Sequence, residues 1–445
     1  MYRKDPGTGW EDYGYTRATF GDLAAGLLLE AAKRRAAAEG EQLDPLVAKQ
    51  LRENVYVDDI CGGGSPEEVK RMVGEEGDQG TLHKILETCG MKLKFVAVLG
   101  DKRQEVAEML GGRVLGLGYN LAEDKISLSI PLQYHNKGRA RQKEMMKLDL
   151  RELEDIRKGR RTFTRREALS LVMGVFDPLG LLSPVLLQGK LLLRRLYDQD
   201  DIGWYTDLPL KEKQSWAAWL EDVAQGAEVS MERAVRPPGA LGNPMVVGFS
   251  DASVSAMCGM IYVVWPMSNG PAVTRLLLAK VRVTPVSGYS EPREELQAVV
   301  IMSRLLLIAL SAAAFTASRV VLSTDSAVCV AALKKVGVSM NAFFANRVSE
   351  VRHILGEARE KAEEVEDVRF VEGKLNPADQ GTRPGCQLQD LDLTSQWQTG
   401  PKFLKGPRET WPLKAAVQGV IPKEELRTKY LQGVVMKVAG GASSS

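Results

Sequence analysis

The sequence predicts an α/β (α+β) fold whose largest part is a mixed five-stranded sheet packed with helices. Two apolar segments, residues 245–253 and 319–326, each run into an aspartate followed by small polar residues, the pattern of a buried strand that ends at an exposed edge. A long apolar helix is predicted between them, beginning near residue 291. The length of 445 residues allows two to four domains, and an apolar content of 44% is ordinary for a globular protein.

The cysteines and histidines of the sequence indicate which disulfide and metal sites the chain can form. The five cysteines are scattered without a Cys-x-x-Cys pair, and the three histidines lack metal-ligand spacing. This pattern is typical of reduced thiols and argues against a disulfide framework or a zinc site. No signal peptide is visible at residues 1–5. We therefore expect an intracellular protein, in a cytoplasmic particle or the nucleus, that is not secreted.

The most apolar run of the chain is residues 296–315. It is interrupted by Gln297, Ser303 and Arg304 and lies inside the predicted sheet domain. This run therefore predicts a buried core helix rather than a membrane span. We expect no membrane partner.

The N-terminal part predicts helices around a short hairpin. Residues 23–40 have a helical pattern, and residues 54–60 form an apolar stretch with Asp58 and Asp59 at its tip. Adjacent aspartates in an apolar strand are costly unless a cation or solvent meets them. Ser65, which is followed by a proline, predicts an N-cap for the next helix.

Residues 137–166 are strongly basic, with twelve Lys or Arg, five Asp or Glu and a net charge of +7. Two interpretations stay open. The segment is either a solvated helix face or linker, or a surface that follows a phosphate backbone, where each neutralised phosphate adds salt-dependent affinity. On the second interpretation, Lys158, Arg160 and Arg161 are candidate nucleic-acid-binding residues.

A turn between helices is predicted at residues 175–185, where Pro178 and Gly180 interrupt regular structure. Asp177 within this turn is interpreted as a turn cap rather than a catalyst. Residues 236–239 predict a linker. Three tryptophans in a predicted helical region are interpreted as core or interdomain packing, with base stacking as the alternative: Trp204, Trp216 and Trp219.

The second half of the chain predicts the rest of the sheet. Residues 257–266 and 273–284 are predicted strands, and residues 368–371 a shorter one. Residues 341–366 predict an amphipathic helix. These elements complete five strands with helices between them.

Acidic residues stand at the ends of these elements. Asp251 and Asp325 end two strands, and Asp379 falls in the first turn of a short helix that Asn376 can cap. The long helix offers three candidates: Glu291, Glu294 and Glu295. Any one of these acids can also be an ordinary cap or turn residue. Carboxylates converging from separate elements are what Mg²⁺ requires, and a two-metal site uses shared carboxylates around a phosphate.

Four motifs resemble the ribonuclease H domain of BEL/Pao-type LTR retrotransposons. They are Phe-Ser-Asp-Ala-Ser at 249–253, Pro-Arg-Glu-Glu-Leu at 292–296, Ser-Thr-Asp-Ser at 323–326 and Asn-Pro-Ala-Asp at 376–379. The resemblance assigns the helix acid to Glu295. It implies hydrolysis of the RNA strand of an RNA/DNA hybrid, with two Mg²⁺, or Mn²⁺ in their place, held by Asp251, Glu295, Asp325 and Asp379. It also implies that the hybrid is recognised by backbone shape and 2′-hydroxyl groups.

Tyr-Val-Asp-Asp at 56–59 resembles the catalytic hairpin of reverse transcriptases, which makes Asp58 and Asp59 catalytic and metal-binding candidates. Residues 175–185 resemble the BEL/Pao connection signature almost residue for residue. The third catalytic carboxylate of such polymerases lies on an upstream strand, and this chain is expected to begin just after it. The resemblance therefore implies an incomplete RNA-directed DNA polymerase module, whose partners are a DNA or RNA template and the rest of the retrotransposon polyprotein.

Four parts are predicted along the chain. They are a partial polymerase palm and thumb at 1–135, a basic helical connection at 136–236, a ribonuclease H-like domain at 240–385, and an extension with a disordered tail at 386–445. The ribonuclease H-like part is expected to fold alone. The alternative function is a catalytically inactive, decayed or host-retained fragment that binds nucleic acid.

Overall fold

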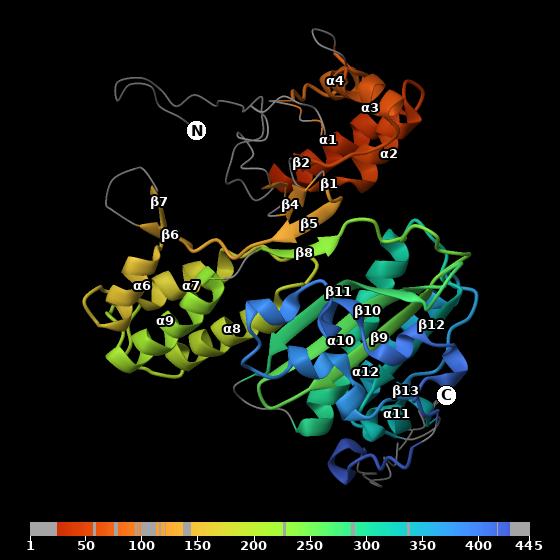
Figure 1. Ribbon diagram of the computed structural model, residues 1–445. Helices are drawn as coiled ribbons and strands as arrows, with labels where there is room; N and C mark the ends of the chain where they lie inside the picture. The colour runs from red at the N-terminus through yellow and green to blue at the C-terminus, as the bar shows by residue number, and fades with distance from the viewer. Residues whose placement is uncertain are drawn as a thin grey trace, which may run out of the picture. The chain divides into compact units, whose positions relative to one another are not determined.

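The computed structural model describes residues 25–56, 59–74, 79–93, 96, 98, 113–114, 117–120, 122–136, 144–225, 228–285, 290–335, 339–415 and 417–427. The chain divides into two compact units, Met1–Val106 and Ala107–Ser445. Figure 1 labels the helices and strands of both units.

The first unit is a small group of helices with a two-stranded hairpin (Figure 1). Its elements are α1 (Ala25–Gly40), α2 (Pro45–Glu53), β1 (Val55–Tyr56), β2 (Asp59–Ile60), α3 (Pro66–Val73) and α4 (Thr81–Thr88). The carboxylate of Asp44 caps α2 by accepting from the Val47 amide, and it accepts from Arg71 Nε of α3 at 3.0 Å. This buried carboxylate therefore joins two of the helices around a core that includes Ile85 and Leu86.

Two local predictions in this unit are confirmed. Strands β1 and β2 are antiparallel, with Tyr56 opposite Asp59, as expected of a hairpin. Ser65 caps α3: its hydroxyl accepts from the Glu68 amide at 3.3 Å, and the Glu68 carboxylate accepts from the Ser65 amide at 2.8 Å. Both cap partners lie within four residues, so the sequence could predict them.

The second unit begins with two small antiparallel sheets. One has the strand order β3-β4-β5-β8, from β3 (Arg113–Val114), β4 (Leu117–Asn120), β5 (Lys125–Leu128) and β8 (Val229–Glu232). The other pairs β6 (Gln133–Asn136) with β7 (Glu144–Lys147). The predicted boundary between residues 135 and 136 thus falls within β6, and a strand after the helical connection completes the first sheet.

The predicted helical connection is present as α6 (Leu150–Arg157), α7 (Arg165–Met173), α8 (Ser183–Tyr197) and α9 (Leu210–Gln225) (Figure 1). Trp216 and Trp219 of α9 are buried with ring centroids 5.7 Å apart, as predicted for core packing. Trp219 Nε1 donates to the Val185 carbonyl of α8 at 3.2 Å. Trp204 differs from the prediction: it lies in a turn before α9 and is 38% exposed.

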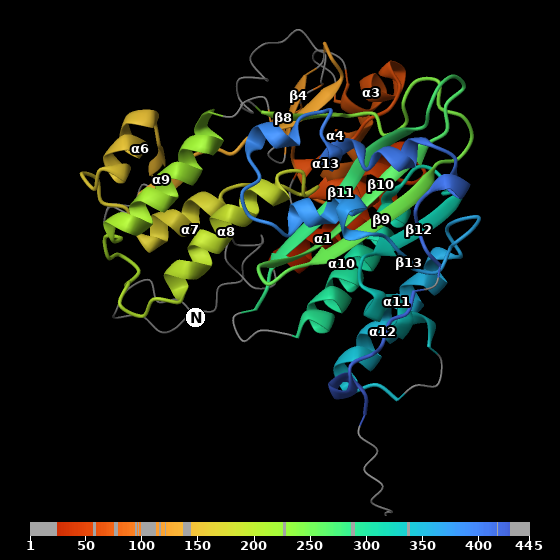
Figure 2. The same ribbon diagram turned by 60° about the horizontal axis from the view of Figure 1, so that its bottom comes forward.

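The central feature of the second unit is a mixed five-stranded sheet, as the sequence predicted. Its order is β11-β10-β9-β12-β13, from β9 (Met245–Ala252), β10 (Ala256–Trp265), β11 (Val273–Val283), β12 (Arg319–Thr324) and β13 (Arg369–Phe370). Strand β10 is antiparallel to both neighbours, whereas β12 is parallel to β9 and β13. One face carries α10 (Glu291–Ala312), α11 (Ala327–Lys334) and α12 (Ala342–Ala358), as Figures 1 and 2 show.

Helix α10 packs directly on the sheet. A Cβ at Gly259 of β10 would lie 2.5 Å from the Met302 amide nitrogen, so only glycine allows so close an approach. Among the described residues, α10 is the one helix long and apolar enough to cross a membrane, and 61% of its most apolar stretch is buried inside the fold. The prediction of a buried core helix is confirmed.

The predicted helix at residues 341–366 is too long. Helix α12 ends at Ala358, and the chain then runs beside β12. The Val320 amide donates to the Glu364 carbonyl at 2.8 Å, and the Glu366 amide donates to the Val320 carbonyl at 3.0 Å. The spacing of charged residues in this stretch resembles that of a helix. Backbone pairing with β12, which is distant in sequence, determines the structure of the stretch instead.

Short helices follow β13, and those between residues 377 and 411 cover the other face of the sheet. They are η1 (Gly373–Leu375), η2 (Pro377–Gly381), η3 (Leu388–Leu391), α13 (Gln396–Thr399), η4 (Lys402–Lys405), η5 (Arg408–Thr410) and η6 (Lys423–Glu425). Trp397 is fully buried there, and its Nε1 donates to the Leu181 carbonyl of the connection at 3.0 Å. One core therefore joins the connection, the sheet and the C-terminal extension, across the predicted boundaries near residues 236–240 and 385.

Candidate active site

The site is built at the carboxyl ends of two neighbouring parallel strands. Strands β9 and β12 are apolar and buried on both faces, as parallel strands inside a sheet require. Their register pairs Ser250 with Thr324, so the next residues, Asp251 and Asp325, lie side by side on the same face. Asp251 is 7% exposed.

The third acid, Asp379, comes from the short helix η2. Asn376 caps this helix, with its side-chain oxygen accepting from the Ala378 amide at 3.2 Å, as predicted. The Asn376 amide group also donates to the Ser250 carbonyl at 2.9 Å. That bond attaches η2 to β9, next to Asp251.

Thr382 bonds one of the clustered acids, and the sequence did not single it out. Its side chain is fully buried, and its hydroxyl bonds the Asp251 carboxylate and the Asp379 carbonyl. The Ser253 hydroxyl donates to the Thr382 carbonyl at 2.8 Å. Thr382 thus fixes β9 to the helix that carries Asp379. The signal in the sequence that could have pointed to Thr382 was its position three residues after Asp379.

The structure distinguishes the three glutamates of α10. Glu295 accepts a hydrogen bond from the hydroxyl of Ser326, which directly follows Asp325. Glu294 is buried and Glu291 is exposed. Glu295 therefore contacts the residue after Asp325, and its assignment as the fourth acid of the site stays a prediction.

Burial and mutual repulsion raise the pKa of the clustered acids. Burial raises the pKa of Asp251 to about 7, and the charges of Asp325 and Asp379 add to this, while the Thr382 hydrogen bond opposes it. Burial also raises the pKa of Asp325. The pKa of Glu295 is raised to about 7, again mainly by burial, with the Ser326 bond opposing. A cation would relieve this crowding of negative charge.

The donor set fits a hard divalent cation. All donors are carboxylate oxygens, which suit Mg²⁺ and Mn²⁺. In the described part of the chain, no three acids already stand in the close arrangement of a formed metal centre. Asp379 is also paired with the exposed Arg383, whose Nε lies 2.6 Å from Asp379 Oδ1. The acids are thus gathered at one edge of the sheet without forming such a centre in the described residues.

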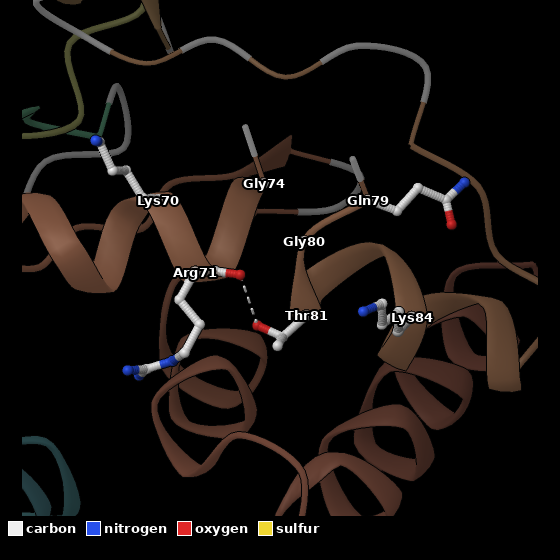
Figure 3. Close-up of a pocket in the computed structure, with 7 residues that line it drawn as sticks. All are labelled: Lys70, Arg71, Gly74, Gln79, Gly80, Thr81 and Lys84. Atoms are coloured by element: carbon white, nitrogen blue, oxygen red, sulfur yellow. Dashed lines mark hydrogen bonds between the residues drawn. The ribbon is translucent and has the colours of Figure 1, made fainter. Parts of the chain in front are cut away.

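The other predicted acids belong to the first unit. Asp59 lies in β2, and its partner Asp58 lies outside the described residues. A separate basic pocket of about 360 Å³ lies in this unit (Figure 3), lined by Lys70, Arg71, Gly74, Gln79, Gly80, Thr81 and Lys84. Arg71 there is tied to Asp44. This pocket shares no residue with the carboxylate site.

The predicted basic residues are ion-paired. Lys158 Nζ lies 2.7 Å from Glu154, Arg160 lies 2.6 Å from Asp155, and Arg161 approaches two acids of α6 and α7. These pairs reduce the positive charge that the three residues present. Their role in nucleic-acid binding stays a prediction.

Asp177 is a turn cap, as predicted. Its two carboxylate oxygens accept from the Leu181 and Leu182 amides, each at 2.9 Å. Burial raises the pKa of this carboxyl. Asp177 therefore stabilises the turn before α8 and stands apart from the acid cluster.

A comparison with protein families matched part of the chain. Residues 164–326 match the family model described as Pao retrotransposon-like RNaseH-like domain. The match runs from the connection helices through Asp325, so it includes Asp251 and Glu295. This part of the chain is therefore similar to the ribonuclease H-like domain of Pao-type retrotransposons. The recognition made from the sequence motifs is confirmed.

Solved structures with similar folds include ribonucleases H and a retroviral polymerase. The N-terminal RNase H domain of a Mycobacterium tuberculosis protein, solved as a fusion with maltose-binding protein, is 11% identical, with 32% of this chain and 91% of that chain covered and a TM-score of 0.22. RNase H1 of Halobacterium salinarum is 11% identical, with 31% and 91% covered and a TM-score of 0.20. The foamy viral protease–reverse transcriptase, solved with double-stranded DNA, is 12% identical, with 80% and 60% covered and a TM-score of 0.33. A comparison with curated proteins gave no match.

Proposed function

We propose that this chain is a ribonuclease H-type endonuclease that hydrolyses the RNA strand of an RNA/DNA hybrid with Mg²⁺ or Mn²⁺. One observation carries the proposal: Asp251, Asp325 and Asp379 meet at the carboxyl ends of the central parallel strands, with Glu295 bonded beside them. Buried acids with raised pKa values at one edge are typical of a functional site rather than of a stabilising network.

Each part of the site has a separate task in this proposal. Bound metal ions would supply activation of a water molecule and stabilisation of the leaving 3′ oxygen. Asp251 and Asp325 would hold them from the two strand ends, and Asp379 and Glu295 would supply further oxygen ligands. Thr382 keeps Asp251 oriented, and Ser326 keeps Glu295 oriented. The hybrid is recognised through its shape and its 2′-hydroxyl groups.

The proposal concerns the nuclease step alone. The hairpin acids Asp58 and Asp59 stay catalytic and metal-binding candidates for a polymerase step, and Asp58 lies outside the described residues. In this proposal the polymerase-like part works with a DNA or RNA template and other parts of a retrotransposon polyprotein, inside the cell. Lys158, Arg160 and Arg161 serve it by following the phosphate backbone.

Cleavage of a labelled RNA/DNA hybrid by the full chain in Mg²⁺ tests the proposal. Asp251→Asn and Glu295→Gln should each reduce the rate by about a hundredfold or more, because each removes a metal-binding charge. Glu294→Gln is the matched control and should retain most of the rate. Full activity in Asp251→Asn would refute the site. A chain that binds the hybrid without cutting it would instead be the inactive nucleic-acid-binding fragment.

A further inference from the structure

A C-terminal segment far from the acids in sequence packs against the helices that place them. We call residues 417–427 the C-terminal strap. It contacts the beginning of α10, which carries Glu295, and the beginning of α11, which follows Asp325. It also contacts the beginning of α12.

The centre of the strap is Glu425, which is only 1% exposed. One carboxylate oxygen accepts from Arg293 Nε at 2.7 Å and from the Ser290 hydroxyl at 3.2 Å, both in the first turn of α10. The other oxygen accepts from the Asn341 side-chain amide at 2.7 Å, at the N-cap of α12. Each of these bonds therefore reaches the start of a helix, where negative charge is favourable.

The backbone of the strap adds further contacts. The Asn341 amide donates to the Glu425 carbonyl at 2.9 Å, and the Arg427 amide donates to the Ser339 carbonyl at 2.9 Å. Ile421 is buried in the core beneath. At Gly419 an added Cβ would lie 2.0 Å from the Ala327 carbonyl oxygen, so the strap touches the first turn of α11 directly.

These contacts matter for Glu295 because it lies two residues after Arg293. Ser290 makes no side-chain capping bond to α10 itself and donates to Glu425 instead. The first turn of α10 is therefore held from outside the helix, by a buried carboxylate of the strap. The loss of a buried partner leaves Arg293, Ser290 and Asn341 without this acceptor.

We propose that Glu425 is a positioning residue for the nuclease site: it fixes the first turn of α10, and thereby the place of Glu295 beside Asp325. This inference rests on the proposed function. It gives the strap a role in catalysis, although the strap lies far from Glu295 in the sequence.

The test is Glu425→Gln in the full chain, with Glu424→Gln as the matched control on the exposed neighbour. Glutamine keeps the size but replaces one acceptor oxygen with an NH2 donor, which then faces the donor of either Arg293 or Asn341. We expect kcat for hybrid cleavage to fall about tenfold, with KM for the hybrid little changed, and the Mg²⁺ concentration for half-maximal rate to rise severalfold. Hydrogen exchange in residues 290–296 should become faster. Glu424→Gln should change none of these.

A purely structural role predicts another result. In that case the loss of rate would match the fraction unfolded, KM and the Mg²⁺ requirement would stay the same, and the inference would be wrong. If Glu425→Gln fails to fold, Arg293→Gln removes the same bond from a side chain that is 33% exposed. If the unmodified chain does not cleave, the proposed function fails, and unchanged exchange in residues 290–296 of the variant would separately refute the positioning role.

Discussion

At the scale of single residues, the buried negative charge of the site opposes folding but favours metal binding. Asp251 and Glu295 both have a pKa raised to about 7, mainly because they are buried. Without a cation, each acid therefore gives up its proton only near neutral pH. The groups that lower these two pKa values are hydroxyls, from Thr382 and Ser326, rather than positive charges. A bound cation would thus supply the missing positive charge.

We predict that the metal-free protein becomes less stable as pH rises. The folded pKa values near 7 exceed the unfolded values of roughly 4, so folding favours the protonated acids. The stabilisation that the protonated acids give to the folded state is fully present below about pH 4 and is lost as the pH rises through about 7. Urea unfolding in EDTA at several pH values measures it, and Mg²⁺ should restore stability above pH 7. The Asp251→Asn, Glu295→Gln double variant should show a flatter dependence; an equally steep one would contradict the prediction.

Thr382→Val tests the hydroxyl that bonds Asp251. Valine preserves the shape but removes the bond that lowers the pKa of Asp251, so that pKa should rise further above 7. We expect the pH–rate profile of hybrid cleavage to shift to higher pH, with a larger loss of rate at pH 7 than at pH 8.5. The exposed Thr410→Val is the control. A uniform loss at all pH values would indicate a packing defect instead.

At the scale of elements, the position of α10 on the sheet decides where Glu295 lies. The closest approach is at Gly259 of β10, where the helix backbone leaves no room for a side chain. Glu295 lies seven residues before Met302, about two helical turns away. A shift of the helix at this contact would therefore reach the acid.

Gly259→Ala should consequently displace α10. We expect the free energy of unfolding to fall by about 1–3 kcal/mol, because the added methyl group meets backbone rather than a flexible side chain. Hybrid cleavage should fall as well. Gly356→Ala in α12 is the matched control, since its Cβ would meet open space and alanine favours helix. Equal stability of the two variants in urea would contradict this account of the packing.

At the scale of the whole molecule, the sheet and the helical connection share one core. The Ala279 amide of β11 donates to the Leu179 carbonyl of the connection turn at 2.8 Å. At Gly180, an added Cβ would lie 1.8 Å from the Ala279 carbonyl oxygen, and its φ of +78° also favours glycine. Trp397 closes the same core from the C-terminal side. The family match, residues 164–326, likewise spans the connection and the sheet.

We therefore predict that residues 239–385 do not fold alone, contrary to the expectation from the sequence. This fragment would expose the sheet face that the connection and Trp397 cover, including Phe249 and Tyr262. Residues 107–427 should unfold cooperatively in urea, whereas the shorter fragment should lack a cooperative transition. Trp397→Ala in the longer piece should also destabilise it strongly, by about 3–5 kcal/mol. A cooperative transition in the short fragment would refute the shared core.

The sequence by itself determined the strands that end in Asp251 and Asp325 and the cap at Asn376. It also determined the succession of strands and helices along the sheet domain. Each of these depends on neighbouring residues: a continuous apolar run, a proline after a cap residue, a polar residue at a strand end. Such signals need no knowledge of the rest of the chain. The resemblance to Pao-type motifs added the choice of Glu295.

Only the tertiary structure decided how these parts meet. The end of α12 at Ala358, the hydroxyl of Thr382 on Asp251, the docking of Glu425 on α10 and the core around Trp397 all join residues far apart in sequence. Local pattern cannot specify them, because their energies come from burial and hydrogen bonds that exist only after the chain has folded. The acids were visible in the sequence, but the groups that hold them in place were not.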